Sequence, residues 1–164
     1  MSNPVIPSFI KPTVAAYSHG APGGVMRTDV AGGAPRYGLD YDRGTQQYNV
    51  TFVLDQGQFS VWTLFFMRTI KKGALTFDMP LDSGFGTEVH ACNIVPESYQ
   101  VSRTGGIAMV VSFVVEAESK AYDWSDGDMS ALFAIYELYG RDTDDLLARI
   151  NQFANVDSLA LQAV

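Results

Sequence analysis

The stretch from residue 48 to residue 73 constrains the fold most, because it encodes a strand and a helix with both helix ends marked. Its first apolar residues alternate with more polar neighbours, which is the period of a half-buried strand. They are Tyr48, Val50, Phe52 and Leu54. Asp55 and Gln58 then form a capping-box pattern, and Gly73 stands where a left-handed C-cap ends a helix. We therefore predict a strand followed directly by a helix over residues 56–72.

Aromatic residues recur at helical spacing inside this expected helix. They are Phe59, Trp62, Phe65 and Phe66. Such a stripe can line a ligand groove, but aromatic residues at this spacing more often belong to a core, and we prefer that interpretation. Lys71 and Lys72 fall in the expected last turn, where the helix dipole favours cations.

Three more strands and two more helices are expected downstream. The strand signals lie at residues 74–79, 87–95 and 107–117. Pro80 closes the first of them, and residues 103–106 have the composition of a hairpin turn. One helix is expected from about residue 127 to Gly140, and another from Asp142 or Thr143. This order predicts a mainly β protein of the α+β class.

The first 45 residues are rich in glycine and proline and cannot sustain a helix or a long central strand. We expect an extended arm with loops there, and short strands at residues 25–30 and 34–39. Residues 46–120 are then the β core with its helix at 56–72, and residues 121–164 form a helical appendage.

The amino-acid composition favours some classes of function and excludes others. The chain has 164 residues, 47% hydrophobic and 18% charged, so few charges are left to cover the surface of a monomer, which favours an assembly. A net charge of -7 disfavours binding to nucleic acid or anionic lipid. A single cysteine excludes an intramolecular disulfide. The chain starts without the pattern of a signal peptide, and its longest apolar stretch, near residues 61–67, is too short for a membrane span.

Few residues suggest catalysis. His90 and Cys92 lie two apart in an expected strand and would share a face. A nucleophile pair also needs an orienting group and an oxyanion site, and neither is signalled, so we interpret the pair as a packed thiol beside an imidazole. His19 is the only other histidine. An enzyme that uses Cys92 and His90 is the third-ranked hypothesis.

Two further motifs have structural explanations. Asp123, Asp126 and Asp128 faintly resemble a calcium loop, but the spacing is wrong and no closing glutamate follows, so helix capping explains them better. The glycines of residues 20–24 lack the lysine and hydroxyl residue of a phosphate loop. We predict no catalytic residue, no metal ligand and no cofactor.

A longer pattern covers residues 47–117. It consists of the run YNVTFVL from Tyr48, the helix with Phe59, Trp62 and Phe65, the run GALTFDMPL from Gly73, and SFVVE from Ser112. This combination resembles minor tail proteins at the tail tip of long-tailed bacteriophages, in particular the lambda-type minor tail protein M and distal tail proteins.

The resemblance implies an antiparallel β-sandwich or barrel of the tail-tube type, with one flanking helix. It implies a structural virion protein, not an enzyme, made in the host cytoplasm and located in the tail. The partners implied are other copies in a ring, commonly a hexamer, and the tail tube and tail hub proteins, with DNA passing through the channel unbound. A negatively charged wall would keep DNA from sticking. The first 45 residues and the C-terminal helices depart from this pattern.

We expect four segments to carry interfaces. They are the arm at residues 4–17, the loop at 20–33, the turn at 82–87, and the apolar residues Leu132, Phe133, Tyr136, Leu147 and Ile150 of the last helices. Packing of those helices onto the chain's own sheet is an equal alternative. The second-ranked hypothesis is a small ligand- or carbohydrate-binding β-sandwich with an aromatic platform made from Trp124, Tyr122 or Tyr99.

Overall fold

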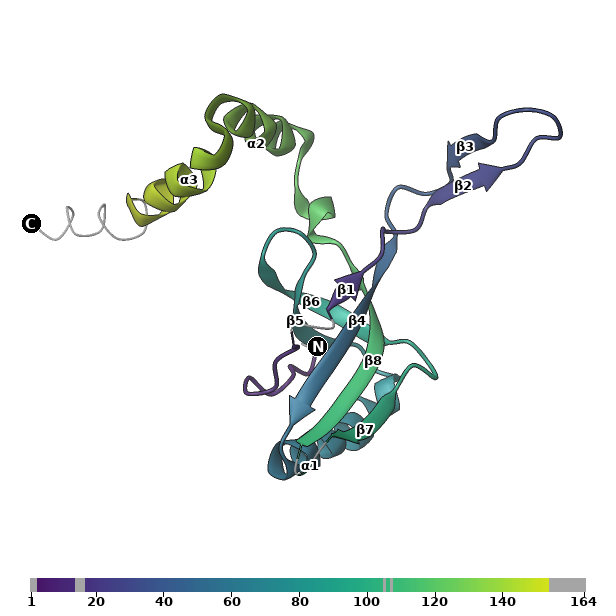
Figure 1. Ribbon diagram of the computed structural model, residues 1–164, viewed down its shortest axis with the longest axis vertical. Coiled ribbons are helices and arrows are strands. Elements are labelled where there is room, and N and C mark those ends of the chain that lie inside the picture. Colours follow the sequence, from purple (N-terminus) through teal and green to yellow (C-terminus); the bar gives the residue numbers. More distant parts are fainter. Residues whose placement is uncertain (1–2, 14–16, 105, 107, 154–164) are drawn as a thin grey trace, which may run out of the picture. The chain divides into compact units, whose positions relative to one another are not determined.

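A computed structural model describes residues 3–13, 17–104, 106 and 108–153 (Figure 1). The chain divides into two compact units, Met1–Tyr122 and Asp123–Val164. The first is mainly antiparallel sheet with one flanking helical segment, and the second is helical. The expected α+β class with a predominance of strands is therefore confirmed.

Two long strands form the centre of the sheet. Strand β4 (Thr45–Leu54) pairs antiparallel with β8 (Ala108–Glu118), from Thr45 opposite Glu118 to Leu54 opposite Met109. The short β1 (Ser18–His19) flanks β4. On the other side of β8 lie β7 (Gln100–Thr104) and β6 (Thr87–Ile94), and β5 (Phe77–Asp82) pairs with β6 at the outer edge (Figure 1). The described strands form an open path, β1-β4-β8-β6-β5, and not the closed barrel that was one expectation.

The prediction that Pro80 closes its strand is wrong. Strand β5 begins at Phe77, passes through Pro80, which lies opposite Val89, and ends at Asp82. A proline fits here because β5 is an edge strand, so the missing N–H falls on the side away from β6.

The expected helix over residues 56–72 is present but changes its winding. Helix α1 (Gln56–Leu64) starts with the predicted capping box between Asp55 and Gln58. A π-helical turn (Phe65–Thr69) follows, in which the Ile70 N–H donates to the Phe65 carbonyl at 3.0 Å. This i→i+5 bond brings Phe65 and Ile70 onto the same, buried side.

The helix end also differs from the prediction. Lys71 and Lys72 lie after the helix in left-handed conformations, with φ of 50° and 64°, so they do not form its last turn. Gly73 has a φ of 88°, and a Cβ atom there would lie 2.9 Å from the Cβ of Ile94. Only glycine fits both the conformation and the close approach.

The core lies on one face of the sheet, under α1. The inward residues of the two central strands are Tyr48, Val50, Phe52, Leu54, Val111, Phe113, Val115 and Ala117. Trp62 of α1 is fully buried, and its ring lies 5.1 Å from that of Phe52 and 5.4 Å from that of Phe113. Phe65 is buried as well, while Phe59 and Phe66 pack at the margin, so the aromatic stripe is confirmed as core.

The N-terminal residues belong to this core, which sequence analysis did not predict. Ile6 is 4% exposed and Ile10 is 1% exposed, so these two residues of the expected arm pack into the chain's own core, whereas Val5 and Phe9 remain exposed. The short strands expected further on are confirmed as a hairpin of β2 (Val25–Thr28) and β3 (Arg36–Leu39). Residues 14–16 of the expected arm lie outside the described residues.

The second unit contains the two predicted helices, α2 (Asp126–Tyr139) and α3 (Thr143–Gln152). Ser125 caps α2, and Asp128 completes a capping box with it. Near the junction of the helices the Tyr136 hydroxyl donates to Asp144 at 2.7 Å. Residues 154–164 of the expected appendage lie outside the described part.

Candidate functional sites

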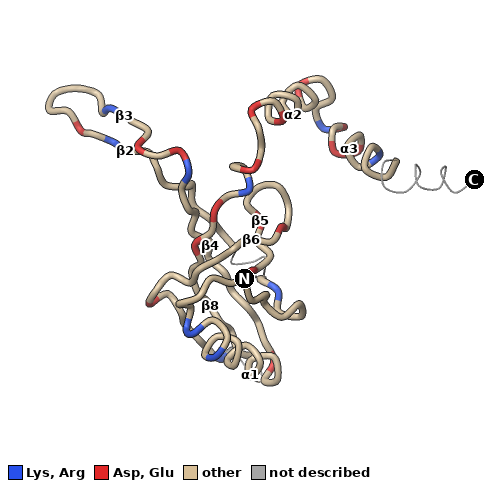
Figure 2. The backbone as a smooth tube through the Cα atoms, turned by 180° about the vertical axis from the view of Figure 1, so that it is seen from behind, with Lys and Arg blue, Asp and Glu red and all other residues tan. Residues whose placement is uncertain are grey.

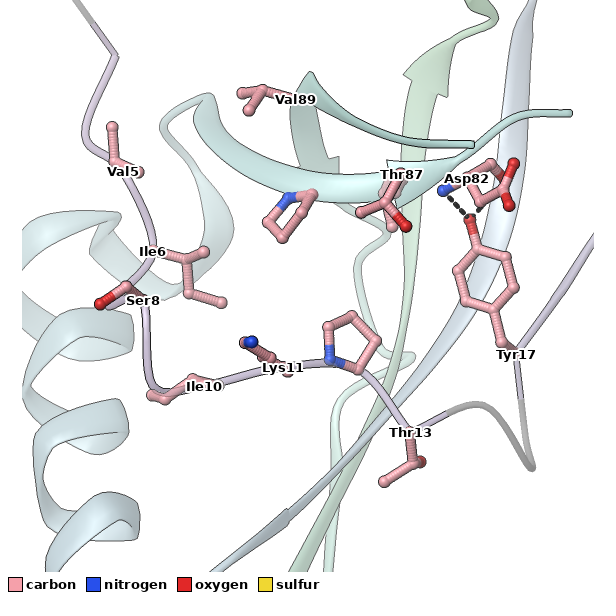
Figure 3. A pocket seen from close by; sticks show the side chains of 13 residues that line it. Val5, Ile6, Ser8, Ile10, Lys11, Thr13, Tyr17, Asp82, Thr87 and Val89 are labelled. Carbon is pink, nitrogen blue, oxygen red and sulfur yellow. Dashed lines mark hydrogen bonds between the residues drawn. The ribbon is translucent and has the colours of Figure 1, made fainter. Parts of the chain in front are cut away.

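A cavity of about 590 Å³ lies between the N-terminal segment and the outer edge of the sheet (Figure 3). The N-terminal segment contributes Val5, Ile6, Ile10 and Pro12 to its wall. Strand β5 contributes Pro80 and Leu81, and β6 contributes Val89. This volume lies within the usual range of ligand pockets, roughly 300–1,000 Å³.

The cavity exists because two anchors hold the N-terminal segment against β5 and leave a gap between them. At one anchor, the Asp78 N–H donates to the Pro4 carbonyl at 2.9 Å and the Ile6 N–H donates to the Asp78 carbonyl at 3.0 Å. At the other, the Tyr17 hydroxyl donates to the Asp82 carbonyl at 2.7 Å and accepts from the Asp82 N–H at 2.8 Å (Figure 3). Pro80 lies between the two anchors.

These anchors also protect the edge of the sheet. The outward backbone groups of β5 belong to alternate residues, and two of the three are already bonded, at Asp78 and Asp82. Pro80 has no N–H to offer. The edge is therefore unsuited to the addition of another strand, and the cavity can accept side chains or a small apolar molecule.

The chemistry of the cavity suits binding more than catalysis. Its wall is mostly aliphatic, with Lys11 and Asp82 as the charged residues. The pKa of the Tyr17 hydroxyl is raised, mainly by burial, so the phenol stays protonated and holds its bonds to Asp82.

His90 and Cys92 share a buried face of β6, as expected. The thiol donates to the His90 backbone carbonyl at 3.2 Å, and not to the imidazole. Burial raises the pKa of Cys92 to about 12. A buried, protonated thiol is a poor nucleophile, which agrees with the interpretation of a packed thiol.

The imidazole of His90 is held by a network that sequence analysis did not find. Its Nδ1 atom lies 2.9 Å from the Glu88 carbonyl, and its Nε2 atom lies 3.1 Å from the Ser83 hydroxyl. A carbonyl only accepts, so Nδ1 is protonated and donates to Glu88. Ser83 belongs to the turn at residues 82–87, and no sequence signal distinguishes it from other turn serines.

The other candidate motifs do not form binding sites in the described structure. Asp128 acts in the capping box with Ser125, and its hydrogen bonds to Ser125 lower its pKa. Within the part of the chain that the structure describes, no three His, Cys, Asp or Glu side chains are grouped to hold a metal ion. None of the described helices is long and apolar enough to cross a membrane.

The proposed aromatic platform is not supported at Tyr99. Its ring stacks on Phe66 at 4.3 Å between centroids, and its hydroxyl accepts from the Trp62 Nε1 at 3.1 Å. Tyr122 is half-buried, accepts a hydrogen bond from the Gly44 N–H and lies under the Arg43 guanidinium. Trp124 is 38% exposed and belongs to the other unit.

Large apolar side chains are exposed on the β2–β3 hairpin. Val25, Met26, Tyr37 and Leu39 are each between 57% and 71% exposed. The hairpin pairs with no other described strand. It lies in the region expected to carry interfaces, residues 20–33, and extends that region to residue 39.

The helical unit exposes even more apolar surface. The exposed large residues are Trp124, Met129, Phe133, Tyr136, Leu138, Tyr139, Ile150 and Phe153. Thr143 is the only fully buried residue among residues 123–153. Of the five residues expected to carry an interface here, Phe133, Tyr136 and Ile150 are exposed, while Leu132 and Leu147 are half-buried.

Comparison with known proteins gives no match for this chain, whether to a protein-family model, a curated protein or a solved structure.

Proposed function

We propose that this chain is a structural subunit of a phage tail tip, which acts by assembling into a ring and catalyses nothing. The observation that carries the proposal is the β2–β3 hairpin with its exposed apolar side chains. An isolated two-stranded hairpin is marginally stable in water, and contiguous exposed apolar surface marks an interaction site. A neighbouring subunit that packs against the hairpin would bury the apolar side chains that the monomer leaves exposed.

The tail-tip assignment rests on the resemblance over residues 47–117, and the observed element order supports it. The runs that carry the resemblance fall on β4, α1, β5 and β8 in succession. In this proposal the ring lies in the virion, between the tail tube and the tail hub.

The charge distribution indicates which unit of the chain would have to line the channel of such a ring. Residues 1–122 contain nine basic and ten acidic residues, a net charge of -1, whereas residues 123–164 contain two basic and eight acidic residues, a net charge of -6. Figure 2 shows both signs along the sheet unit. Repulsion of DNA by the wall therefore requires the helical unit to face the channel, because the sheet unit is nearly neutral.

The test removes the apolar side chains of the hairpin. Tyr37→Ser with Leu39→Ser is compared with Val53→Ser with Val101→Ser, which removes two exposed apolar residues from other strands. We expect rings in negative-stain images of the wild type and of the control, and none for the hairpin variant at unchanged far-UV circular dichroism. Rings from the hairpin variant would contradict the proposal.

A second function, binding of a small apolar ligand, is favoured by the cavity between the N-terminal segment and β5. Val89→Arg places a long charged side chain at the cavity wall. If the cavity is a ligand site, an environment-sensitive apolar dye binds the wild type saturably and binds this variant at least tenfold more weakly. Equal dye binding by both proteins removes the support for this function.

A further inference from the structure

The cavity beside β5 has two polar side chains at its wall that the described part of the chain does not bond. Lys11 lines the cavity from the N-terminal segment, and Thr87 lines it from the start of β6 (Figure 3). Among the described residues, neither the Lys11 ammonium nor the Thr87 hydroxyl has a hydrogen-bond or ion-pair partner. These two groups are therefore available to a ligand.

The other polar groups at the wall are already engaged or turned away. The Tyr17 hydroxyl makes both of its bonds to the Asp82 backbone. The Thr13 hydroxyl donates to a backbone carbonyl of β4 at 2.9 Å. The Asp82 carboxylate accepts from the Gly84 N–H at 2.8 Å, which commits one of its oxygens to the turn. The Ser8 side chain points away from the cavity (Figure 3).

The two available groups define the chemistry of the ligand's head. An ammonium group only donates hydrogen bonds, and a hydroxyl can donate one, so the group that fits both is an acceptor. Hydrogen bonds to an ionised acceptor are shorter and stronger than those to a neutral one. A carboxylate, with two acceptor oxygens, can bond Lys11 and Thr87 together.

The rest of the wall defines the ligand's body. It is mainly aliphatic, and Ile10 and Leu81 are buried, whereas Lys11 and Thr87 are exposed. A lysine at such a place keeps its ammonium in water while its stem lies along apolar surface. The charged end of a ligand therefore stays at the side of the cavity that faces water, and its apolar part lies against the aliphatic residues.

We propose that the cavity binds an amphipathic carboxylate of the fatty-acid class, with its carboxylate at Lys11 and Thr87 and its hydrocarbon chain along the aliphatic wall. This inference rests on the second function proposed above, the binding of a small apolar ligand, and adds the chemistry of the head group. It is independent of the ring proposal.

The net charge of the chain makes the head group a demanding test. At a net charge of -7, the field of the whole protein favours a cationic ligand over an anionic one. A preference for a carboxylate therefore has to come from a local cation, and Lys11 is the cation at this wall.

The experiment is isothermal titration calorimetry of the full chain at neutral pH. It compares three ligands with the same linear hydrocarbon chain and different heads, which are decanoate, decanol and decyltrimethylammonium, each below its micelle-forming concentration. Lys11→Met keeps an apolar stem and removes the charge, and Lys11→Glu reverses the charge. Lys71→Met and Lys71→Glu are the matched controls, because Lys71 is exposed and does not line the cavity. Far-UV circular dichroism checks that each variant is folded.

We expect the wild type and both Lys71 controls to bind decanoate at least about threefold more tightly than decanol, the scale of an exposed ion pair with an added hydrogen bond. Lys11→Met should lose this preference and bind decanol within about twofold of the wild type, since the aliphatic wall is unchanged. Lys11→Glu should prefer the ammonium head, a gain that an unfolded variant could not show. Added NaCl should weaken the binding of decanoate and not that of decanol.

Three results would overturn the inference: equal affinities of the wild type for decanoate and decanol, a preference of the wild type for the ammonium head, or a carboxylate preference that survives in Lys11→Glu. Each of them leaves the apolar-ligand function in place if decanol and the apolar dye still bind saturably. If the wild type binds neither the dye nor any of the three ligands, both the ligand function and this inference fail.

Discussion

Truncation of Ile10 tests whether the N-terminal segment is a structural part of the sheet unit. Ile10 is 1% exposed, although it lies in a proline-rich segment far from the core strands in sequence. The Ile10→Ala change removes three buried carbon groups, worth about 2.4 kcal/mol at ~0.8 kcal/mol each. The space left behind adds a further penalty, and buried Ile→Ala changes as a class cost about 2–5 kcal/mol.

The cavity beside Ile10 places the expected value in the lower half of that range. Its volume of about 590 Å³ adjoins the site, so the new space joins an existing opening and can take up water. We therefore expect Ile10→Ala to lower the free energy of unfolding by about 3 kcal/mol, a large part of the ~5–15 kcal/mol of a typical domain.

Urea unfolding followed by tryptophan fluorescence measures this change. A Trp124→Phe background leaves Trp62, which is buried in the sheet unit, as the only reporter. Phe9→Ala is the control, because Phe9 is 51% exposed and its loss should change stability by no more than about 0.5 kcal/mol. An Ile10→Ala effect below about 1 kcal/mol would refute the placement of the segment in the core.

Three further predictions concern single residues. The buried Cys92 should not react with a thiol reagent in the native protein at pH 8 and should react fully in urea. Because burial raises the pKa of Cys92 from 9.0 to about 12, its contribution to the free energy of unfolding is complete below pH 9 and falls as the pH rises to 12. Cys92→Ala should reduce this fall in urea titrations. Asp55→Ala should lower the free energy of unfolding by about 1 kcal/mol through loss of the cap, and Asp55→Asn should retain most of it. Gly73→Ala should lower the free energy of unfolding by at least about 1–2 kcal/mol, because a left-handed alanine is strained and its Cβ would meet Ile94. Gly106→Ala is the control, because Gly106 has a positive φ with open space around it, so that only the strain is added.

Local signals were sufficient for the elements whose ends and faces are encoded by neighbouring residues. The alternation around Tyr48 predicts β4 and its buried face, and the pair Asp55 and Gln58 predicts the start of α1. The buried aromatic stripe around Trp62 follows from helical spacing. Each of these depends on contacts within a few residues.

The features that sequence analysis missed depend on contacts between distant segments. Ile6 and Ile10 look like residues of a loop, and only the bonds of the segment to Asp78 place them in the core. Pro80 closes a strand in a local interpretation, but an edge position tolerates it. Ser83 acquires its role from His90, seven residues away, and no local pattern encodes that pair.

The candidate surfaces were predicted in part. The expectation that residues 20–33 and the last helices carry interfaces agrees with their exposed apolar side chains, but exposure is a property of the folded chain and could not be read from composition. The cavity could not be predicted, because it forms where two separately anchored segments leave space between them.

We propose that this chain functions by assembling with copies of itself. Negative-stain imaging of the full-length protein, with its mass measured on the same concentrated sample, tests this most directly. We expect closed rings with an open centre and a particle mass that is a whole multiple of the mass of one chain, sixfold for a hexamer. A monomeric mass at every concentration, with no closed particle in the images, would contradict it.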